Sequence, residues 1–356
     1  MWARAAAIAS TCLLLNGCYL LQAAGGQFDV LRHSKPIPQV LADPGTTAAT
    51  RSGLERVASA REFAVRELGL PASRSYQRYA DLGRPFVVWN LVATPEFAVE
   101  PRRWCFPVAG CVAYRGYFKE QQARDMALRL ATRGDDVAVG GVAAYSTLGH
   151  FADPVFGSML AWRDTRLVGT LFHELAHERL YFPGDSEINE AFASVVEAEG
   201  VRRWLAAAGR TADLQAYEAA EARAGEFAQL LRATRSELAR LYGSGRPVAE
   251  MRIEKQRAFG RLKFAYEQLR RRWGGQGAYD AWFARSLNNA HLVAVATYRD
   301  CMPGLERELR AAGRDLPVFY ARLETLRDAS AGTRRQALCS NHSADQAGPP
   351  PVATPR

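Results

Sequence analysis

Several common recognition signals are missing from this 356-residue chain. It has no glycine-rich phosphate loop and no Cys/His finger spacing. Lysine and arginine outnumber aspartate and glutamate by 46 to 37, which gives a net charge of +9, but this surplus is spread thinly and its densest cluster is the arginine run at 270–272. We therefore expect no nucleic-acid partner, and a surface that is compatible with anionic lipid headgroups.

Long apolar runs are also missing, except near the N-terminus. Arg4 precedes an apolar run from Ala5 to Leu15, which is too short to span a bilayer as a stable helix and is typical of a signal peptide. The sequence that follows, Leu13-Leu-Leu-Asn-Gly-Cys18, resembles a bacterial lipobox, in which the cysteine is diacylated and becomes the mature N-terminus.

These features predict a signal peptide over residues 1–17 and a lipid anchor on Cys18. Tyr19 follows the cysteine in place of aspartate, which by the enteric sorting pattern favours the outer membrane. The expected location is the periplasmic side of a bacterial membrane, with the chain attached through its lipid. Ordinary cleavage to a soluble periplasmic protein is the alternative.

Cysteine is scarce, with six residues in the whole chain. Cys12 would leave with the signal peptide and Cys18 would carry lipid, so four remain. An oxidising compartment makes disulfides plausible, and proline and glycine between Cys105 and Cys111 suit a small closed loop. We predict the pairs 105–111 and 301–339. The long and unequal spacings argue against a zinc site made of these cysteines.

The sequence His173-Glu174-Leu-Ala-His177 lies inside an apolar segment that is predicted to be helical. Residues four apart on an α-helix share one face, so both imidazoles can point at a single ion. Zinc accepts neutral histidine nitrogens at about 2.0–2.1 Å, and a catalytic site leaves one position for water. Glu174 can reach that open side and accept the proton of the water.

A third ligand is expected on the next helix, at Glu190. This residue lies thirteen positions after His177, beyond a helix stop and turn at residues 181–184. The set is then the two-histidine, one-glutamate set of thermolysin, and Asn189-Glu190-Ala191 resembles part of the second metal helix of that enzyme. Ser194 stands where thermolysin-like enzymes carry an acid, so Glu197 is our candidate for orienting a histidine. The alternative is an amphipathic helix pair whose glutamates face solvent.

The remaining segments predict an α+β fold that is mostly helical. We expect a zincin-like catalytic core with a small mixed sheet, a helical C-terminal half, and an antiparallel helical hairpin at about 212–273 joined by a Gly/Pro turn. The expected divisions are a lipid-anchored tether and lead-in without regular elements over 18–50, one metallopeptidase domain over 51–330, and a disordered tail over 331–356.

A strand is predicted over residues 137–146, shortly before the zinc helix. Metallopeptidases with this helix pair bind substrate as an added strand at such a sheet edge. Residues 144–149 are therefore our candidate substrate strand, with Gly149 allowing another backbone to approach closely. A plain core strand is the alternative.

Several segments of the chain resemble bacterial lipoproteins labelled predicted aminopeptidases. They are Trp104-Cys105, the run from Cys111 to Phe118, Thr147-Leu-Gly149, Asp153-Pro154, the metal motif, Asn189-Glu190, and Leu287-Asn-Asn-Ala290 with Tyr298. The similarity covers most of the mature chain. It implies a peptidase that carries one zinc ion on His173, His177 and Glu190.

The sequence thus predicts a zinc-dependent peptidase, an aminopeptidase by resemblance, that acts on peptides in the bacterial periplasm. Glu174 would be the general base, and Tyr298 is the first candidate to stabilise the oxyanion, because related aminopeptidases use a tyrosine downstream of the metal helices. The competing hypothesis is a lipid-anchored scaffold or partner-binding protein that holds a metal without turnover. Glu174 speaks against it, because a purely structural site needs no base.

Overall fold

The computed structural model describes residues 19, 21–106, 110–144, 147, 151–299 and 301–339, except for the side chains of residues 296–299. This part of the chain is mostly helical and contains small sheets, one of them mixed, so the predicted α+β class is confirmed. Within the same residues, no helix combines the length and the apolar character needed to cross a bilayer.

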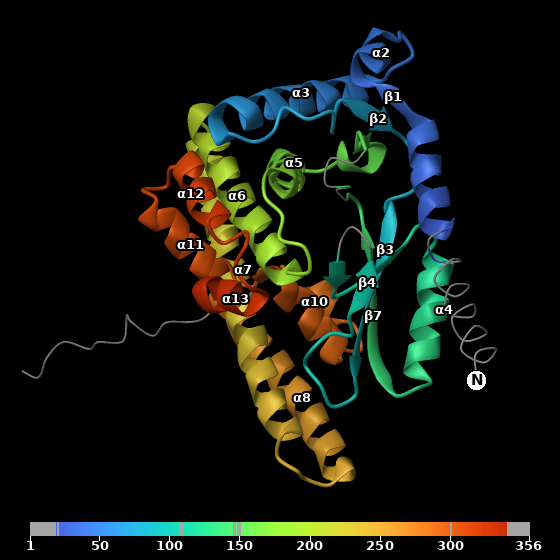
Figure 1. The fold of residues 1–356 in the computed structure, drawn as a ribbon, viewed down its shortest axis with the longest axis vertical. Coiled ribbons are helices and arrows are strands. Elements are labelled where there is room, and N and C mark those ends of the chain that lie inside the picture. Colours follow the sequence, from blue (N-terminus) through green and yellow to red (C-terminus); the bar gives the residue numbers. More distant parts are fainter. Residues whose placement is uncertain are drawn as a thin grey trace, which may run out of the picture.

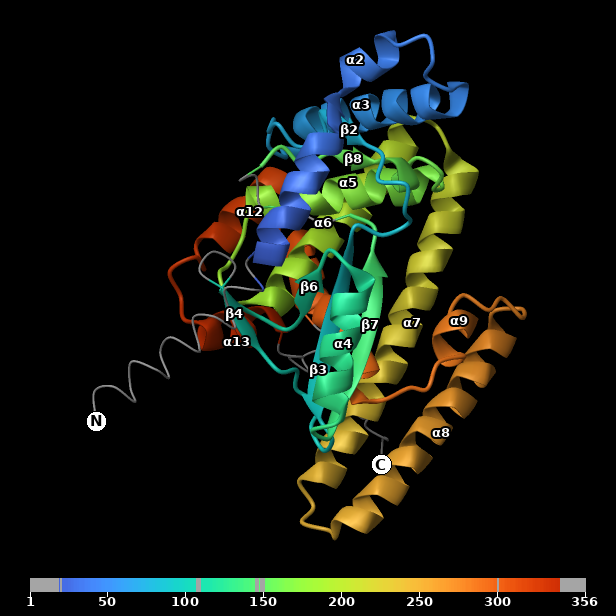
Figure 2. The ribbon, with the colours of Figure 1, turned by 90° about the vertical axis from the view of Figure 1, so that its right-hand side faces the viewer.

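Helices and strands follow one another along the chain without a regular repeat (Figures 1 and 2). The strands are β1 (Ser34–Pro36), β2 (Arg78–Ala80), β3 (Val88–Pro95), β4 (Trp104–Phe106), β5 (Gly110–Val112), β6 (Arg115–Tyr117), β7 (Asp135–Val142) and β8 (Val155–Phe156). The helices of the first half are α2 (Ile37–Ala42), α3 (Ala48–Leu68), α4 (Glu120–Ala131), the 3-10 turn Gly157–Met159, α5 (Asp164–Arg179) and α6 (Ser186–Ala207). Those of the second half are α7 (Thr211–Tyr242), α8 (Val248–Arg272), α9 (Asp280–Phe283), α10 (Asn289–Arg299), α11 (Met302–Ala311), α12 (Leu316–Glu324) and α13 (Ala331–Cys339).

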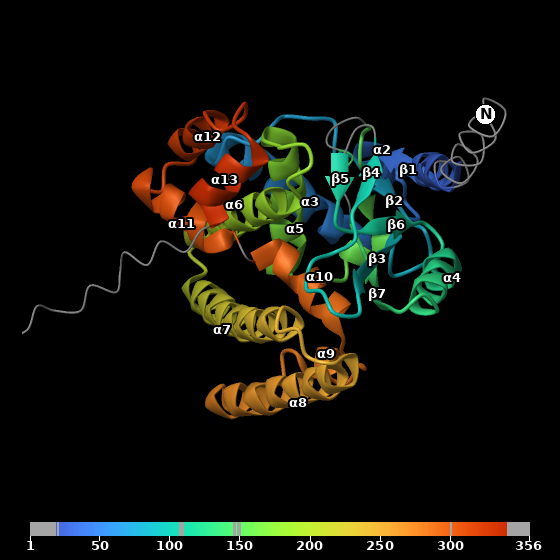
Figure 3. The same cartoon turned by 60° about the horizontal axis from the view of Figure 1, so that its bottom comes forward.

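The largest sheet has the strand order β6-β3-β7 and is antiparallel. Strand β3 pairs with β7 over its whole length, from Val88 opposite Val142 to Pro95 opposite Asp135. Helices α4 and α10 lie on either side of this sheet (Figure 3). Strand β7 is an edge strand in the described pairing, and it ends at Val142, earlier than the predicted strand.

Helix α6 lies at the centre of the helical part of the molecule. It packs against α5, α7, α10 and α11, and its buried positions are distributed around the whole helix. A helix that is apolar on all sides is stable only when other elements surround it. The few charged side chains on α6 are therefore held in a largely apolar setting, which matters for the site described below.

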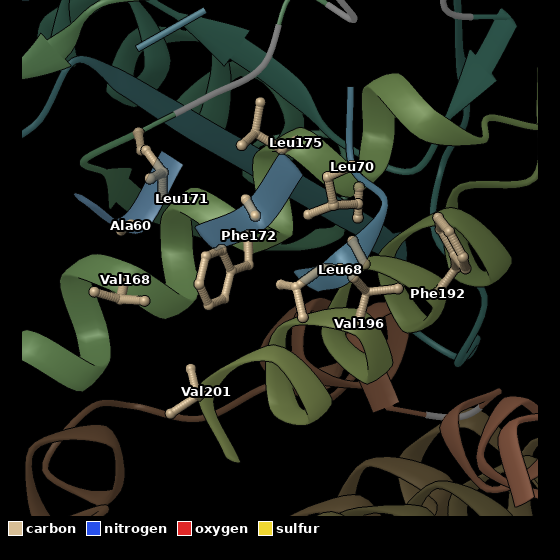
Figure 4. Close-up of a cluster of buried hydrophobic side chains, with 14 of the residues drawn as sticks. Ala60, Leu68, Leu70, Val168, Leu171, Phe172, Leu175, Phe192, Val196 and Val201 are labelled. Carbon is tan, nitrogen blue, oxygen red and sulfur yellow. The ribbon is translucent and has the colours of Figure 1, made fainter. Parts of the chain in front are cut away.

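The core around α5 is formed by side chains from α3, α5 and α6 (Figure 4). Phe172 and Leu171 of α5 are completely buried, and Phe172 stacks on Phe63 of α3. Full burial of side chains of this size contributes about 1.5–3 kcal/mol each. The face of α5 opposite its metal-motif histidines is thus fixed in the core.

Two glycines let α5 and α6 approach closely. A Cβ atom added at Gly200 of α6 would lie 2.6 Å from the Phe172 ring, and one added at Gly169 of α5 would lie 2.8 Å from Oε1 of Glu197. Both distances are shorter than real Cβ contacts. A larger residue at Gly200 would clash with the Phe172 ring, and one at Gly169 would displace the Glu197 carboxylate.

The predicted helical hairpin is present as α7 and α8, which extend away from the rest of the molecule (Figures 1 and 3). Its seam contains Phe227, Leu238, Leu262 and Tyr266, and the short helix α9 adds Phe283 to the same cluster. The hairpin therefore has a small apolar core of its own. Lys255 of α8 also pairs with Asp136 of β7 at 2.6 Å, which ties α8 to the main sheet.

The lead-in before residue 51 differs from the expectation of an irregular tether. Residues 21–33 are helical, β1 pairs with β2, and Pro36 and Pro38 lie at the start of α2 instead of breaking it. Proline is well suited to the first turn of a helix, where its missing N–H has no intrahelical partner. Burial of Val30 and Ile37 in the main core fixes this segment to the domain.

The expected tail also begins with an ordered helix, α13. Leu338 is buried in the main core, and Arg334 is buried and pairs with Asp185 at 2.5 Å. Contacts far apart in the sequence, which no local apolar period reveals, thus stabilise residues 331–339.

Two disulfides lie within the part of the chain that the structure describes. Cys105 pairs with Cys111 across the β4–β5 hairpin, and Cys301 pairs with Cys339, which ties α13 to the start of α11. These are the pairings chosen from the sequence. The bonds differ in the length of chain they enclose, with sequence separations of 6 and 38.

Loss of the longer loop's disulfide should be the more destabilising change. Chain entropy predicts a cost of about 4 kcal/mol for the Cys301→Ser/Cys339→Ser double variant and about 2 kcal/mol for Cys105→Ser/Cys111→Ser. Urea unfolding of the oxidised proteins measures both. Equal costs, or the reverse order, would contradict the entropic explanation.

Candidate metal centre

The two histidines of the metal motif lie on the face of α5 that looks toward α6. His173 and His177 are separated by one helical turn, and their rings are 5.0 Å apart between centroids. Both side chains are largely shielded from solvent, with 12% and 8% of their surface exposed. Because α5 is fixed in the core by its opposite face, this pair of imidazoles is held rigidly.

A short turn after α5 brings the chain back so that α6 starts beside the histidines. The side-chain amide of Asn189 closes this turn by accepting a hydrogen bond from Phe182 N and donating one to Phe182 O, both at 2.8 Å. Gly184 adopts a φ of +83°, a left-handed conformation that glycine tolerates. The asparagine that fixes the turn therefore directly precedes Glu190 and sets its position.

Three donor atoms converge at this point. Oε2 of Glu190 lies 3.3 Å from Nε2 of His173 and 3.7 Å from Nε2 of His177. Ligands at about 2.0–2.2 Å from one tetrahedral zinc ion would lie roughly 3.3–3.6 Å from each other. The three residues form the metal-ligand group found among the described residues, and their chemistry and spacing fit zinc.

Glu197, two helical turns after Glu190, contacts the other nitrogen of His173. Its Oε2 lies 3.1 Å from Nδ1 of His173. An ionised carboxylate only accepts hydrogen bonds, so Nδ1 carries the hydrogen. In the neutral ring Nε2 then keeps its lone pair toward Glu190 and His177, which is the arrangement that a metal ligand requires. Glu197 reaches this position over Gly169, whose lack of a side chain leaves the necessary space.

The site carries an excess of negative charge. Among the described residues, Glu174, Glu190 and Glu197 form no ion pair with lysine or arginine. Burial alone would lower the pKa of His173, but hydrogen bonds to Glu190 and Glu197 and the charge of Glu174 raise that pKa well above its usual value. Burial alone would raise the pKa of Glu190, yet the two histidines bring it down to about 2. Such a site favours a bound cation.

Glu174 lies beside the ligand group without being part of it. Burial is the main reason that its pKa is raised, while His173 and His177 act in the opposite direction. Asp153 is close enough for the Glu174 charge to affect it, and burial raises the pKa of Asp153 to about 7. Its carboxylate accepts hydrogen bonds from Thr147 N at 2.7 Å and from Thr147 Oγ1 at 2.9 Å. Asp153 thus holds Thr147 near the site.

Tyr114 is a residue of the site that the sequence analysis missed. It follows the disulfide-bonded β4–β5 hairpin, and Arg103 of that hairpin region donates a hydrogen bond to Gly184 O at 3.3 Å, which ties it to the α5–α6 turn. Burial raises the pKa of Tyr114 well above its usual value, and the charges of Glu190 and Glu174 add to this effect. The tyrosine lies in the run from Cys111 to Phe118, which contributes to the family resemblance but from which no site residue was predicted.

Some predicted site residues lie outside the described part of the chain. Cys18 and Gly149 are among them, and Tyr298 lies on α10 but its side chain is not described. On the same helix, Nδ1 of His291 contacts Oδ1 of Asn288 at 2.8 Å, and burial lowers the pKa of His291 to about 4. This histidine is therefore neutral and engaged with its own helix start.

The two asparagines that begin α10 have a structural role. Nδ2 of Asn288 donates a hydrogen bond to Val137 O, and Nδ2 of Asn289 donates one to Glu96 O, each at 2.9 Å. The Tyr242 hydroxyl in turn donates to Oδ1 of Asn289. These contacts join α10 to the main sheet and to the hairpin, and they leave both amides engaged away from the metal motif.

Glu197 should control metal affinity by orienting His173. Glu197→Ala is expected to weaken zinc binding by about 10- to 100-fold, the usual cost of losing such a hydrogen-bond partner, and Glu197→Gln should weaken it less. Competition with a chelator measures the affinity. Glu187→Gln is the matched control, because Glu187 lies on the same helix but pairs with Arg335. Unchanged affinity in Glu197→Ala would refute the assignment.

Comparison with known proteins identifies the family of the chain. No curated protein and no solved structure matches the chain. The family model described as "Putative aminopeptidase" matches residues 18–338, which include His173, Glu174, His177 and Glu190 as well as the Cys105–Cys111 disulfide. Because that match covers most of the sequence, the chain belongs to this aminopeptidase family.

Proposed function

We propose that this protein is a zinc-dependent peptidase, an aminopeptidase, that acts on peptides at the periplasmic side of a bacterial membrane. The observation that carries the proposal is the convergence of His173, His177 and Glu190. A further acid, Glu174, lies beside them and is not one of the three ligands. Membership of the aminopeptidase family supports peptide as the substrate class.

The three ligands would hold one zinc ion per chain. When bound, zinc would supply Lewis acidity, which lowers the pKa of a water molecule and polarises a peptide carbonyl. Glu174 would accept the proton of the attacking water and later donate it to the leaving amine. Glu197 would keep His173 in the tautomer that presents Nε2 to the site.

A donor is also needed for the negative charge that develops on the carbonyl oxygen. We propose two tyrosines for this role, Tyr298 from the sequence and Tyr114 from the structure. The hydroxyl of Tyr114 is kept protonated by burial and by the neighbouring carboxylates, so it is available as a donor. The substrate itself would lie along residues 144–149, which continue from the edge strand β7 and include Gly149.

The proposed location rests on the N-terminal sequence. Residues 1–17 would be removed as a signal peptide, and Cys18 would be acylated and attach the protein to the periplasmic face of a membrane, the outer membrane by the residue at position 19. Two acyl chains hold a protein stably at a bilayer, whereas one chain holds it only marginally.

The Glu174→Gln variant tests whether this is an enzyme. Glutamine keeps the size of the side chain but cannot accept a proton, so the variant should fold and retain one zinc ion by elemental analysis. Hydrolysis of a peptide library, followed by mass spectrometry, should fall by about 10²- to 10⁴-fold, mainly in kcat. Glu187→Gln is the control. Loss of zinc in Glu174→Gln would make Glu174 a ligand, and full activity would place the chemistry elsewhere.

The same peptide assay distinguishes the two tyrosines. Replacement of the oxyanion donor by phenylalanine should lower kcat by about 10²- to 10³-fold with little change in KM. We therefore expect this loss in Tyr114→Phe or in Tyr298→Phe, with zinc content unchanged. Wild-type kcat in both variants would show that neither hydroxyl serves this role. Removal of single N-terminal residues from the library, as opposed to internal cuts, would identify an aminopeptidase.

A further inference from the structure

Tyr19, the residue directly after Cys18 in the sequence, is packed onto the folded domain. Its ring stacks on Phe106 of β4 with 5.2 Å between centroids and meets the edge of Tyr117 of β6 at 5.7 Å. The guanidinium of Arg115 lies 4.1 Å from the centre of the Tyr19 ring. Neighbouring Cα atoms are about 3.8 Å apart, so a lipid on Cys18 would enter the bilayer right beside this aromatic cluster.

The helix of residues 21–33, which we call the N-terminal helix, packs on the domain through one face. Nε2 of Gln22 donates a hydrogen bond to Gly116 O at 3.3 Å, and Oε1 of Gln22 accepts one from Phe118 N at 3.2 Å. One turn on, Gly26 lies so close to the Phe118 ring that an added Cβ would be 2.0 Å from it. Another turn on, Val30 is completely buried.

The opposite face of the N-terminal helix is apolar and exposed. Leu21 and Phe28 are seven residues apart, which is two helical turns, so they share this outward face. They are 74% and 68% exposed. Such a face has no stabilising partner in water, and it immediately follows the cysteine that is proposed to carry lipid.

Helix α4, which lies on the same side of the molecule, carries a third exposed apolar side chain. Figure 2 shows the N-terminal helix and α4 together on the face turned to the viewer. Leu128 of α4 is 66% exposed and lies on the outside of the helix, away from the buried Ala123 and Ala127. Of the four described large apolar side chains with an exposure of 66% or more, two are on the N-terminal helix, one is on α4, and the fourth is Phe264 on α8.

We propose that this face, defined by Leu21, Phe28 and Leu128, lies in the headgroup region of the same bilayer that holds the Cys18 lipid. The inference rests on the proposed lipid anchor and deepens it. Amphipathic helices bind a bilayer by burying their apolar face at the boundary between headgroups and acyl chains, and basic side chains add attraction to anionic lipids. Arg115, over the Tyr19 ring, and Arg129, exposed next to Leu128 on α4, can supply that attraction.

The consequence is a fixed orientation. A flexible tether would let the metal centre change its orientation to the membrane. Here the lipid-bearing cysteine directly precedes the packed Tyr19, and the N-terminal helix makes a second contact with the bilayer. Together they would hold the domain in one orientation. Lipid and helix would then form one continuous attachment surface.

The proposal is tested with tryptophan as a depth probe in the full-length protein. Phe28→Trp is compared with Phe264→Trp, a matched control because the two phenylalanines are 68% and 67% exposed. Each protein is reconstituted into vesicles of phosphatidylcholine and phosphatidylglycerol, with or without bromine on the acyl chains. We expect brominated lipid to quench the fluorescence of the tryptophan at position 28 strongly. The tryptophan at position 264 should be quenched no more than the native tryptophans.

Intact-mass analysis of the same samples separates this proposal from the anchor. If Cys18 carries lipid but the two probes are quenched equally, the docking face is refuted while the anchor stands. If Cys18 carries no lipid and the probe at position 28 is still quenched selectively, the docking face is supported and the anchor is wrong. If Cys18 carries no lipid and the two probes are quenched equally, both the anchor and the docking face are refuted.

Discussion

The close packing of α5 against α6 is the interaction on which the metal centre depends. Glu190 can lie between two imidazoles only if the helix that carries it approaches the histidine helix without intervening side chains. Gly169 and Gly200 provide this approach at two points, and Phe172 fills the space over Gly200. The same contact gives Glu197 its path to His173. The geometry of the site thus depends on the two glycines as much as on the histidine and glutamate side chains that form it.

The electrostatics of the site follow from its position beside the most buried helix. Carboxylates removed from water are unfavourable unless a positive charge or hydrogen bonds compensate them. Here the compensation comes from two histidines. One of them, His173, contacts both Glu190 and Glu197. A divalent cation would satisfy all of these groups together. A structural role for the metal would not account for Glu174, which adds further negative charge without serving as a ligand.

The sequence was most informative where the structure is local. The His173–His177 pair is set by helical periodicity, and Glu190 was predictable because the intervening turn is short. The same reasoning placed Glu197 two turns further along. Tyr114, in contrast, is brought to the site by the docking of a hairpin on a distant turn, and no periodicity encodes that.

The two ends of the domain illustrate the same limit. Prolines in the segment before residue 51 and the lack of an apolar period after residue 330 predicted irregular structure at both ends. They are ordered by contacts with distant parts of the chain, such as Gln22 with the backbone of β6 and Arg334 with Asp185. Local propensity is a weak guide when partners that are remote in the sequence provide most of the stabilisation.

The ion pair between Arg334 and Asp185 has a consequence for the time at which the site forms. Asp185 directly precedes α6, while its partner is 149 residues further along. A chain that is synthesised from its N-terminus contains both metal helices long before Arg334 and Cys339 are made. Contacts of such sequence separation form late, because closing a long loop costs entropy. The start of α6, which carries Glu190, therefore gains this ion pair only after residue 334 has been synthesised.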